Sequence, residues 1–389
     1  MSRGFAQRKR TNTKKTNKMQ EFCKKNKWAE DYALFCALKE KHSHLPWYEW
    51  DEDIKLREKT ALEKARAELS DEISFYIFLQ YEFFSQWHAL LKYAASKGVK
   101  IIGDMPIYLS HDSSDVWANP HLFSLDKDMH LERCAGVPPD YFCSEGQKWG
   151  NPLYNWDALK EEGYSLWMER ISHALSIYDV VRIDHFRAFS AYWSIPAEES
   201  AVCGKWEKGP GMDFFDRVNK LYGEDRIIAE DLGDIDDDVR ELVKNTGFPG
   251  MGVMQFAFIT DDDTPHLPHN YSKKTVGYTG THDNNTILGW LWESSEESRR
   301  YALSYCNFEG DWGIGGAQSP SIRAIIRTLW KSGAILTIVP VQDLCGFGGD
   351  TCMNHPGVAE GNWCFRLTES SLLSIDRGYY KELNRLYKR

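Results

Sequence analysis

The chain has 389 residues, of which 42% are hydrophobic and 14% aromatic, enough for one large barrel or two ordinary domains. A formal net charge of −10 argues against a role on nucleic acid, and the lack of any run of about 18 apolar residues predicts no membrane-spanning helix. The nine cysteines are scattered and form no C-x-x-C pair, which favours reduced thiols and a cytoplasmic location.

Residues 1–27 form a basic segment, with Glu21 as the single acid. An apolar stretch of the kind found in secretion signals is lacking, so secretion is not predicted. A basic arm for RNA, for a membrane surface or for organelle import is one interpretation. We expect instead a solvated, flexible segment.

Apolar residues at helical spacing predict three helices, over residues 28–41, 52–70 and 73–97. One side of the third helix is apolar and consists of Phe83, Trp87, Leu90, Leu91 and Ala94. Gly98 ends this helix, and the strand-like segment 99–104 follows at once. A helix, a glycine and a buried strand in this order are typical of an α/β unit.

Short apolar runs predict parallel strands at 99–104, 179–184, 226–231, 251–258, 275–282 and 334–340. Helical stretches lie between them, such as 236–245, where three aspartates suit a helix start. Parallel strands joined by helices form a doubly wound sheet or a (β/α)8 barrel, and acids at several strand ends favour the barrel. A closed barrel has eight strands, and the first two are not found before residue 99.

We therefore expect an α/β fold of the TIM-type (β/α)8 class with inserted helical subdomains, incomplete at the N-terminus. The expected parts are the basic segment 1–27, a helical subdomain at 28–97 and the barrel at 98–389. The interval 105–178 is too long for one helical connection, so we expect a cleft-forming insertion there.

Three of the apolar runs end in carboxylates with polar neighbours. Arg182 and Asp184 are two residues apart on a strand and so share a face, where the guanidinium would keep Asp184 ionised. Such a carboxylate suits a nucleophile, and a structural ion pair is the alternative.

Glu230 ends the second run and is followed by Asp231. A partly desolvated carboxylate beside another should have a raised pKa, which suits a general acid. An acid at a helix N-terminus is the alternative. Asp283 follows His282 in a third segment, where its carboxylate can bind sugar hydroxyls or simply belong to a turn. Three acids in one cleft would fit the chemistry of a glycosidic bond.

Other motifs give weaker indications of a functional site. His266 and His269 lack a third metal ligand, so we expect surface histidines. For His111, Asp112 and Asp115 we expect capping and hydrogen bonding instead of a cation site. A dinucleotide-binding G-x-G-x-x-G, a P-loop, an H-E-x-x-H and a G-x-S-x-G are all lacking, which leaves fewer competing chemistries. Chemistry on a glycosidic bond needs no metal or organic cofactor, and we expect none.

The acidic strand ends occur together with further motifs in a fixed order, namely Gly103–Tyr108, His111–Trp117, Gly136–Phe142, Gly146–Pro152, Met353–Gly357 and Gly361–Trp363. Together they resemble the 4-α-glucanotransferases (amylomaltases or disproportionating enzymes) of glycoside hydrolase family 77, in the α-amylase clan. The resemblance covers about residues 28 to 367. Family members begin with a first-strand segment and a glycine- and proline-rich region, which we do not find here.

The resemblance implies that Asp184 is the nucleophile, Glu230 the acid/base and Asp283 the stabiliser of the transition state. It implies substrate contacts from Asp104, Tyr108, Gln147, Trp149, Arg182, His282 and Asn354. The implied reaction is a retaining transfer of α-1,4-glucan segments, from maltooligosaccharides or from starch or glycogen, to glucose or a maltooligosaccharide. We expect a monomer or weak homodimer. The alternatives are a hydrolase of the same clan and a catalytically silent, truncated glucan-binding relic.

Overall fold

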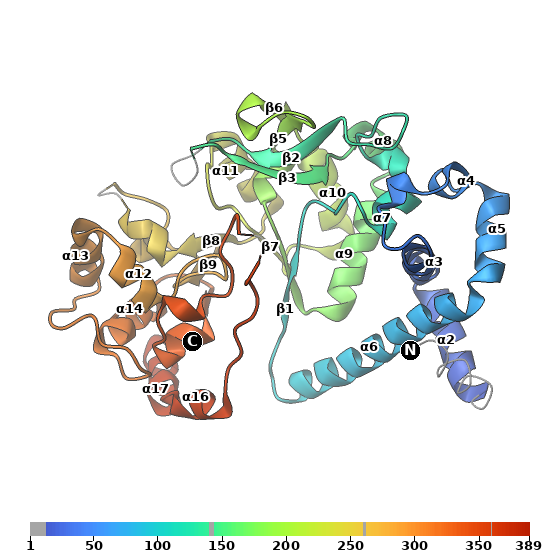
Figure 1. The fold of residues 1–389 in the computed structure, drawn as a ribbon. Coiled ribbons are helices and arrows are strands. Elements are labelled where there is room, and N and C mark those ends of the chain that lie inside the picture. The colour runs from blue at the N-terminus through green and yellow to red at the C-terminus, as the bar shows by residue number, and fades with distance from the viewer. Residues whose placement is uncertain (1–12, 140–143, 260–261, 359) are drawn as a thin grey trace. The chain divides into compact units, whose positions relative to one another are not determined.

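The computed structural model describes residues 13–139, 144–259, 262–358 and 360–389 (Figure 1). The chain forms two compact units. The first comprises Met1–Ile227 and Asp234–Leu242, and the second comprises Ile228–Gly233 and Val243–Arg389. Within the described ranges, no helix has the length and apolar character needed to cross a membrane. The domain limits predicted after residues 27 and 97 stay predictions.

Helices fill the first unit up to its first strand. The helices predicted over 28–41 and 73–97 are confirmed as α3 and α6, and the one over 52–70 is divided because Arg57 takes a left-handed φ of 57°. Between residues 13 and 101 every regular element described is a helix. The bounds are α2 (Thr13–Lys25), α3 (Trp28–Lys41), η1 (Trp47–Glu49), α4 (Glu52–Lys55), α5 (Lys59–Glu68) and α6 (Ser70–Ser96).

The basic segment that we expected to be flexible thus contains helix α2. Met19 on this helix is buried, and the ring of Phe22 contacts those of Trp28, Tyr81 and Phe84. Met19 and Phe22 are three residues apart and share a helix face, through which this strongly basic helix packs.

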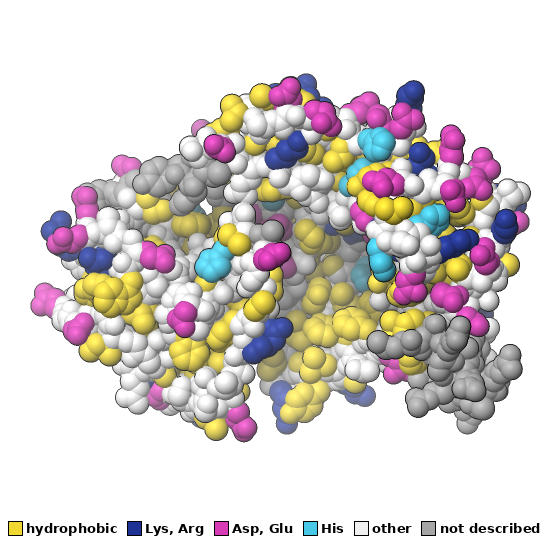
Figure 2. Space-filling view, in the orientation of Figure 1, with side chains coloured by type: hydrophobic (Ala, Val, Ile, Leu, Met, Phe, Trp, Pro, Cys, Tyr) yellow, Lys and Arg dark blue, Asp and Glu magenta, His cyan; other side chains and the backbone are white. Residues whose placement is uncertain are grey.

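The apolar side predicted for α6 is covered only in part. Trp87, Leu91 and Ala94 are half-buried, whereas Phe83 is 54% and Leu90 48% exposed. The buried residue of this helix is Phe84. Figure 2 shows hydrophobic side chains at the surface over α6. Helical periodicity finds the apolar stripe but cannot tell which part of it a neighbour covers. Here the ring of Phe84 packs against those of Phe22 on α2, Trp28 on α3 and His173 in the segment 165–177.

Two sheets form the rest of the first unit. The parallel one pairs β1 (Ile102–Met105) with β4 (Val180–Ile183), with Asp104 opposite Arg182. Strand β7 (Ile227–Ala229) lies where the chain passes from the first unit into the second. The second sheet, at the top of Figure 1, is antiparallel and was not predicted. Its order is β3 (Gln147–Pro152), β2 (Arg133–Val137), β5 (Ala191–Pro196), β6 (Lys205–Lys208).

Fully buried aromatic rings of the first unit pack against one another, namely those of Trp167, Phe186, Phe189, Phe214 and Phe215. Helices of the same unit are α7 (Ser114–Ala118), α8 (Trp156–Glu161), α9 (Ser165–Ile177) and α10 (Gly211–Tyr222). This aromatic core supports the turn that follows β4, because Phe186 and Phe189 belong to it.

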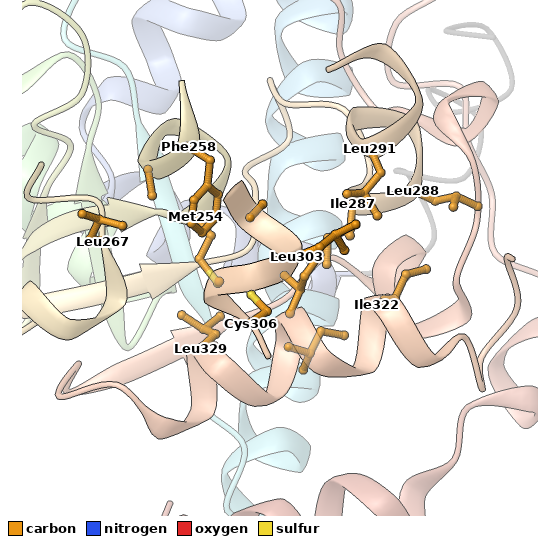
Figure 3. Close-up of a cluster of buried hydrophobic side chains, with 14 of the residues drawn as sticks. Met254, Phe258, Leu267, Ile287, Leu288, Leu291, Leu303, Cys306, Ile322 and Leu329 are labelled. Atoms are coloured by element: carbon orange, nitrogen blue, oxygen red, sulfur yellow. The ribbon is translucent and has the colours of Figure 1, made fainter. Parts of the chain in front are cut away.

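The second unit is built on a parallel sheet of order β10 (Leu336–Ile338), β9 (Thr275–Tyr278), β8 (Gly250–Val253). Each of the six predicted strands has a counterpart, but the one predicted over 251–258 is wrong in its second half, where β8 ends at Val253 and residues 254–258 form a 3-10 helix. Its core joins the 3-10 helix η5 (Met254–Phe258) to three helices through side chains such as Phe258, Leu291 and Leu329 (Figure 3). The helices of this unit are α12 (Ile287–Glu293), α13 (Glu296–Tyr305), α14 (Pro320–Lys331), α15 (Val341–Cys345), α16 (Glu369–Ser374) and α17 (Arg377–Tyr387).

Candidate active site

In the first unit, Arg182 joins two carboxylates at the ends of β1 and β4. Its Nε donates to Asp104 Oδ1 at 2.8 Å and its Nη2 to Asp104 Oδ2 at 2.6 Å, which is a bidentate interaction. Nη2 also donates to Asp184 Oδ1 at 3.2 Å. The guanidinium is buried, whereas the side chains of Asp104 and Asp184 are 45% and 42% exposed. The predicted pairing of Arg182 with Asp184 is confirmed, and both carboxylates remain open to solvent.

Aromatic rings lie next to this cluster. Tyr108 is buried, stacks on Tyr154 and lies 6.2 Å from the ring of Trp149 on β3. Burial raises the pKa of Tyr108 well above its usual value, so the phenol stays neutral. Trp149 is part-exposed and its Nε1 donates to Gln147 Oε1 at 3.1 Å.

His185 belongs to the same group, and our sequence reasoning did not single it out. Its ring lies edge-on to Trp149 at 4.9 Å, and its φ of 48° turns the chain sharply after Asp184. Burial, together with Arg187, lowers its pKa to about 3, which keeps the imidazole neutral. The available signal was its place directly after the acid that ends β4.

A second missed residue is Arg187, which secures the segment after Gly233. Its Nη1 donates to the carbonyl of Asp234 at 2.5 Å and its Nη2 to Asp236 Oδ2 at 3.3 Å. The guanidinium lies 3.8 Å from the centre of the Trp206 ring, and burial lowers its pKa. Asp236 Oδ1 in turn accepts the N–H of Val239 at the start of α11 (Asp237–Thr246), as expected of a helix-start acid.

In the second unit, Asp283 lies between two polar side chains. Asn354 Nδ2 donates to Asp283 Oδ1 at 2.5 Å, and His282 Nε2 lies 3.2 Å from Asp283 Oδ2. The backbone N–H of Asn354 also donates to the carbonyl of His282 at 3.1 Å. The ring of Trp363 lies 5.1 Å from that of His282, and Trp363 is 52% exposed. The structure thus brings three predicted residues together and adds a tryptophan.

Glu230 directly follows β7 and is part-exposed. Its neighbour Asp231 accepts the backbone N–H of Met251 at 2.6 Å. Burial raises the pKa of Asp231 to about 6, even though backbone N–H groups donate to its carboxylate. The raised pKa that we predicted for Glu230 stays a prediction, and so does the convergence of Glu230 and Asp283 with Asp184.

The weaker motifs are explained by local contacts. His266 is half-buried, its Nδ1 accepts the N–H of Val253, and burial lowers its pKa to about 4. His269 is exposed and bonds to the hydroxyl of Tyr305. His111 stacks on Tyr48 at 4.2 Å. In the part of the chain that the structure describes, no three His, Cys, Asp or Glu side chains are grouped to hold a metal ion.

Comparison with known proteins identifies the family. The family model described as glycoside hydrolase 77, 4-alpha-glucanotransferase, matches residues 1–372. This chain belongs to the 4-α-glucanotransferase family. The match begins before residue 28, so it includes the basic segment that our sequence resemblance left out.

Relatives in this family are similar over most of the chain. The 4-alpha-glucanotransferase of Thermus thermophilus is 46% identical over 349 residues, which cover 89% of this chain and 69% of that protein. The Clostridium butyricum enzyme is 43% identical over 370 residues, covering 93% of this chain and 74% of that protein.

The fold agrees with solved structures of family members. Amylomaltase from Streptococcus agalactiae, in complex with acarbose, superimposes with a TM-score of 0.92 at 39% identity, covering 97% of this chain and 76% of that one. Corynebacterium glutamicum amylomaltase has a TM-score of 0.73 at 18% identity, covering 97% and 56%, and shows the fold alone. The predicted α/β fold of the TIM-barrel class is confirmed.

Proposed function

We propose that this 4-α-glucanotransferase moves α-1,4-glucan segments by a retaining double displacement in which Asp184, Glu230 and Asp283 are the catalytic residues. The observation that carries the proposal is the environment of Asp184. Its carboxylate ends a parallel strand, accepts a hydrogen bond from the Arg182 guanidinium and keeps 42% of its side chain exposed. A cation favours the ionised form that a nucleophile requires, and exposure lets a substrate reach it.

In the first step, Glu230 gives its proton to the glycosidic oxygen while a carboxylate oxygen of Asp184 attacks the anomeric carbon. The bond to the leaving sugar breaks, and a glycosyl ester of Asp184 forms. In the second step, Glu230 takes the proton of an acceptor hydroxyl, whose oxygen attacks the same carbon and releases the Asp184 carboxylate. Retention requires the two carboxyl groups to be about 5–5.5 Å apart.

Asp283 binds the hydroxyls of the reacting sugar and stabilises the positive charge that develops on its ring. Support comes from the hydrogen bond that Asn354 donates to it, which orients the carboxylate. Asp104, Tyr108, Gln147, Trp149, Arg182, His282 and Asn354 contact the substrate. Part-exposed Trp149 and Trp363 offer the flat apolar faces against which sugar rings pack.

Transfer instead of hydrolysis requires that a sugar hydroxyl, held in near-attack geometry, reaches the ester before water does. We propose that glucose and maltooligosaccharides are the acceptors and that the donors come from starch or glycogen. The acarbose in the Streptococcus agalactiae complex supports an oligosaccharide ligand.

Incubation with maltotriose tests this function. A transferase produces glucose and longer maltooligosaccharides at a constant total of reducing ends, and Asp184→Asn or Glu230→Gln should abolish both products. An increase in reducing ends would indicate a hydrolase. Lack of any product from a cooperatively melting wild-type chain would indicate a silent relic and refute the proposal.

We also propose a cytoplasmic enzyme of starch or glycogen metabolism that is a monomer or weak homodimer. Plant relatives from potato and Arabidopsis thaliana are described as chloroplastic/amyloplastic. Fractionation of source cells and light scattering on the purified chain test these two points, and a plastid location or a stable larger oligomer would contradict them.

A further inference from the structure

Asp231 is a carboxylate next to the acid/base residue that the mechanism above leaves without a role. Its side chain turns to the neighbouring strand β8, where Oδ1 accepts the N–H of Met251 at 2.6 Å. The other oxygen packs against Gly250. A Cβ on that glycine would lie 2.3 Å from Asp231 Oδ2, a distance that no real side chain allows. The Asp231 carboxylate therefore occupies space that is free only because residue 250 is a glycine.

The residue on the other side of Glu230 is fastened to the same stretch. The N–H of Ala229 donates to the carbonyl of Pro249 at 2.9 Å. Ala229 and Asp231 thus hold the chain before and after Glu230 to residues 249–251. This stretch is itself fixed, because Gly250 pairs with Thr275 of β9 and its N–H donates to the carbonyl of Lys274 at 2.9 Å.

Stability alone does not explain a carboxylate here. Burial raises the pKa of Asp231 to about 6, so at higher pH the folded chain carries a charge that water would solvate better. An ionised carboxylate accepts an N–H more strongly than a neutral amide oxygen does, so it fastens the chain more firmly to Met251. A group that is costly to the fold and adjacent to a reacting residue fits a functional role.

We propose that Asp231 is a positioning residue for Glu230, which it holds at the leaving oxygen by fastening the end of β7 to Met251 and Gly250. The inference rests on the proposed function, because it requires Glu230 to act as acid and base. It does not require Asp231 to touch the substrate.

The test compares two donors. Maltotriose needs a proton on its leaving oxygen, so it needs a well-placed Glu230. With α-maltosyl fluoride as donor, fluoride leaves without being protonated when Asp184 forms its ester. With azide as acceptor, the anion attacks the anomeric carbon without a base to deprotonate it. This pair of reagents bypasses Glu230 in both steps, and Glu230→Ala provides the reference pattern.

We expect Asp231→Ala to lower kcat on maltotriose about 100-fold, the effect of displacing a catalytic group by about 1 Å, and to leave the fluoride–azide reaction within about threefold. Asp231→Asn should recover most of the loss, because its amide oxygen can accept from Met251. Gly250→Ala provides a second route if Asp231→Ala does not fold. A methyl group there displaces the carboxylate and should give the same donor-selective loss.

Asp343→Asn is the matched control, since Asp343 is another buried carboxylate of the second unit, with a pKa raised to about 6. It should change both reactions by the same factor. Equal losses on both donors for Asp231→Ala and Gly250→Ala, or no loss, would overturn the positioning role while leaving the proposed function intact. A wild-type chain inactive on both donors would overturn both.

Discussion

Arg182 should determine both the activity and the acid limit of this enzyme, because one guanidinium serves two carboxylates. Lysine at this position keeps the charge but has a single nitrogen on a flexible stem, so it cannot grip Asp104 at two points and also reach Asp184. The variant Arg182→Lys therefore removes contacts without removing the cation.

The size of the effect follows from the contacts. A hydrogen bond to a charged group contributes about 1.5–3 kcal/mol, and the 42% exposure of Asp184 argues for the lower end. Loss of about 1.5 kcal/mol at the nucleophile corresponds to a roughly tenfold fall in kcat. A similar amount, lost from the grip on Asp104, should lower the free energy of unfolding by about 1–2 kcal/mol.

Arg182→Met removes the charge as well. Asp184 then faces a neighbouring carboxylate without a cation, which makes an ionised nucleophile harder to form and moves the acid limb of the kcat profile to higher pH. Initial rates of glucose release from maltotriose across the acid range, with denaturant melts of each variant, measure both effects.

Arg133→Lys is the control, since Arg133 binds Ser194 and lies 3.7 Å from Glu207 in the antiparallel sheet of the same unit. It should lose stability and keep the acid limb in place. If Arg182→Lys retains wild-type kcat and Arg182→Met leaves the acid limb unmoved, the role assigned to this guanidinium is refuted.

Three further outcomes are expected. Burial raises the pKa of Asp343 from 3.8 in the unfolded chain to about 6 in the folded chain, so this carboxyl group makes wild type more stable as the pH falls through 6. Asp343→Asn should remove this pH dependence of the free energy of unfolding, which is worth at most about 3 kcal/mol. Denaturant melts at several pH values measure it, and an unchanged pH slope would contradict the prediction. Asn354→Ala removes the donor to Asp283 and should lower kcat about tenfold with little change in melting, whereas a change in KM alone would show a binding role. Trp149→Ala should raise KM for maltotriose several-fold and leave the melt unchanged, because the ring is part-exposed; an unchanged KM would remove it from the substrate site.

The parallel strands were predictable because they lie in short apolar runs, such as Val180–Ile183 and Ile227–Ala229. The antiparallel sheet was not, since β3 and β6 contain mostly exposed residues such as Lys148, Trp149 and Lys205. Their hydrogen bonds depend on partners far along the chain, which no local pattern reveals. The burial of Phe84 instead of Phe83 on α6 was missed for the same reason.

Within the candidate site, the pairing of Arg182 with Asp184 followed from their spacing on one strand. Its stronger bonds to Asp104 depend on the register between β1 and β4, which the sequence does not contain. Asp231 was noted only as a neighbour of Glu230, because its partners Met251 and Gly250 are about 20 residues away on the next strand.

The order in which the chain visits its two units limits how such an enzyme can be rearranged. The chain enters the second unit at Ile228, returns to the first at Asp234 and leaves it again at Val243. No single break in the gene separates the two bodies cleanly. A C-terminal fragment that starts at Val243 keeps β8, β9 and β10 but lacks Glu230. Chimaeras between relatives should therefore retain function only when no exchange point falls within residues 228–243.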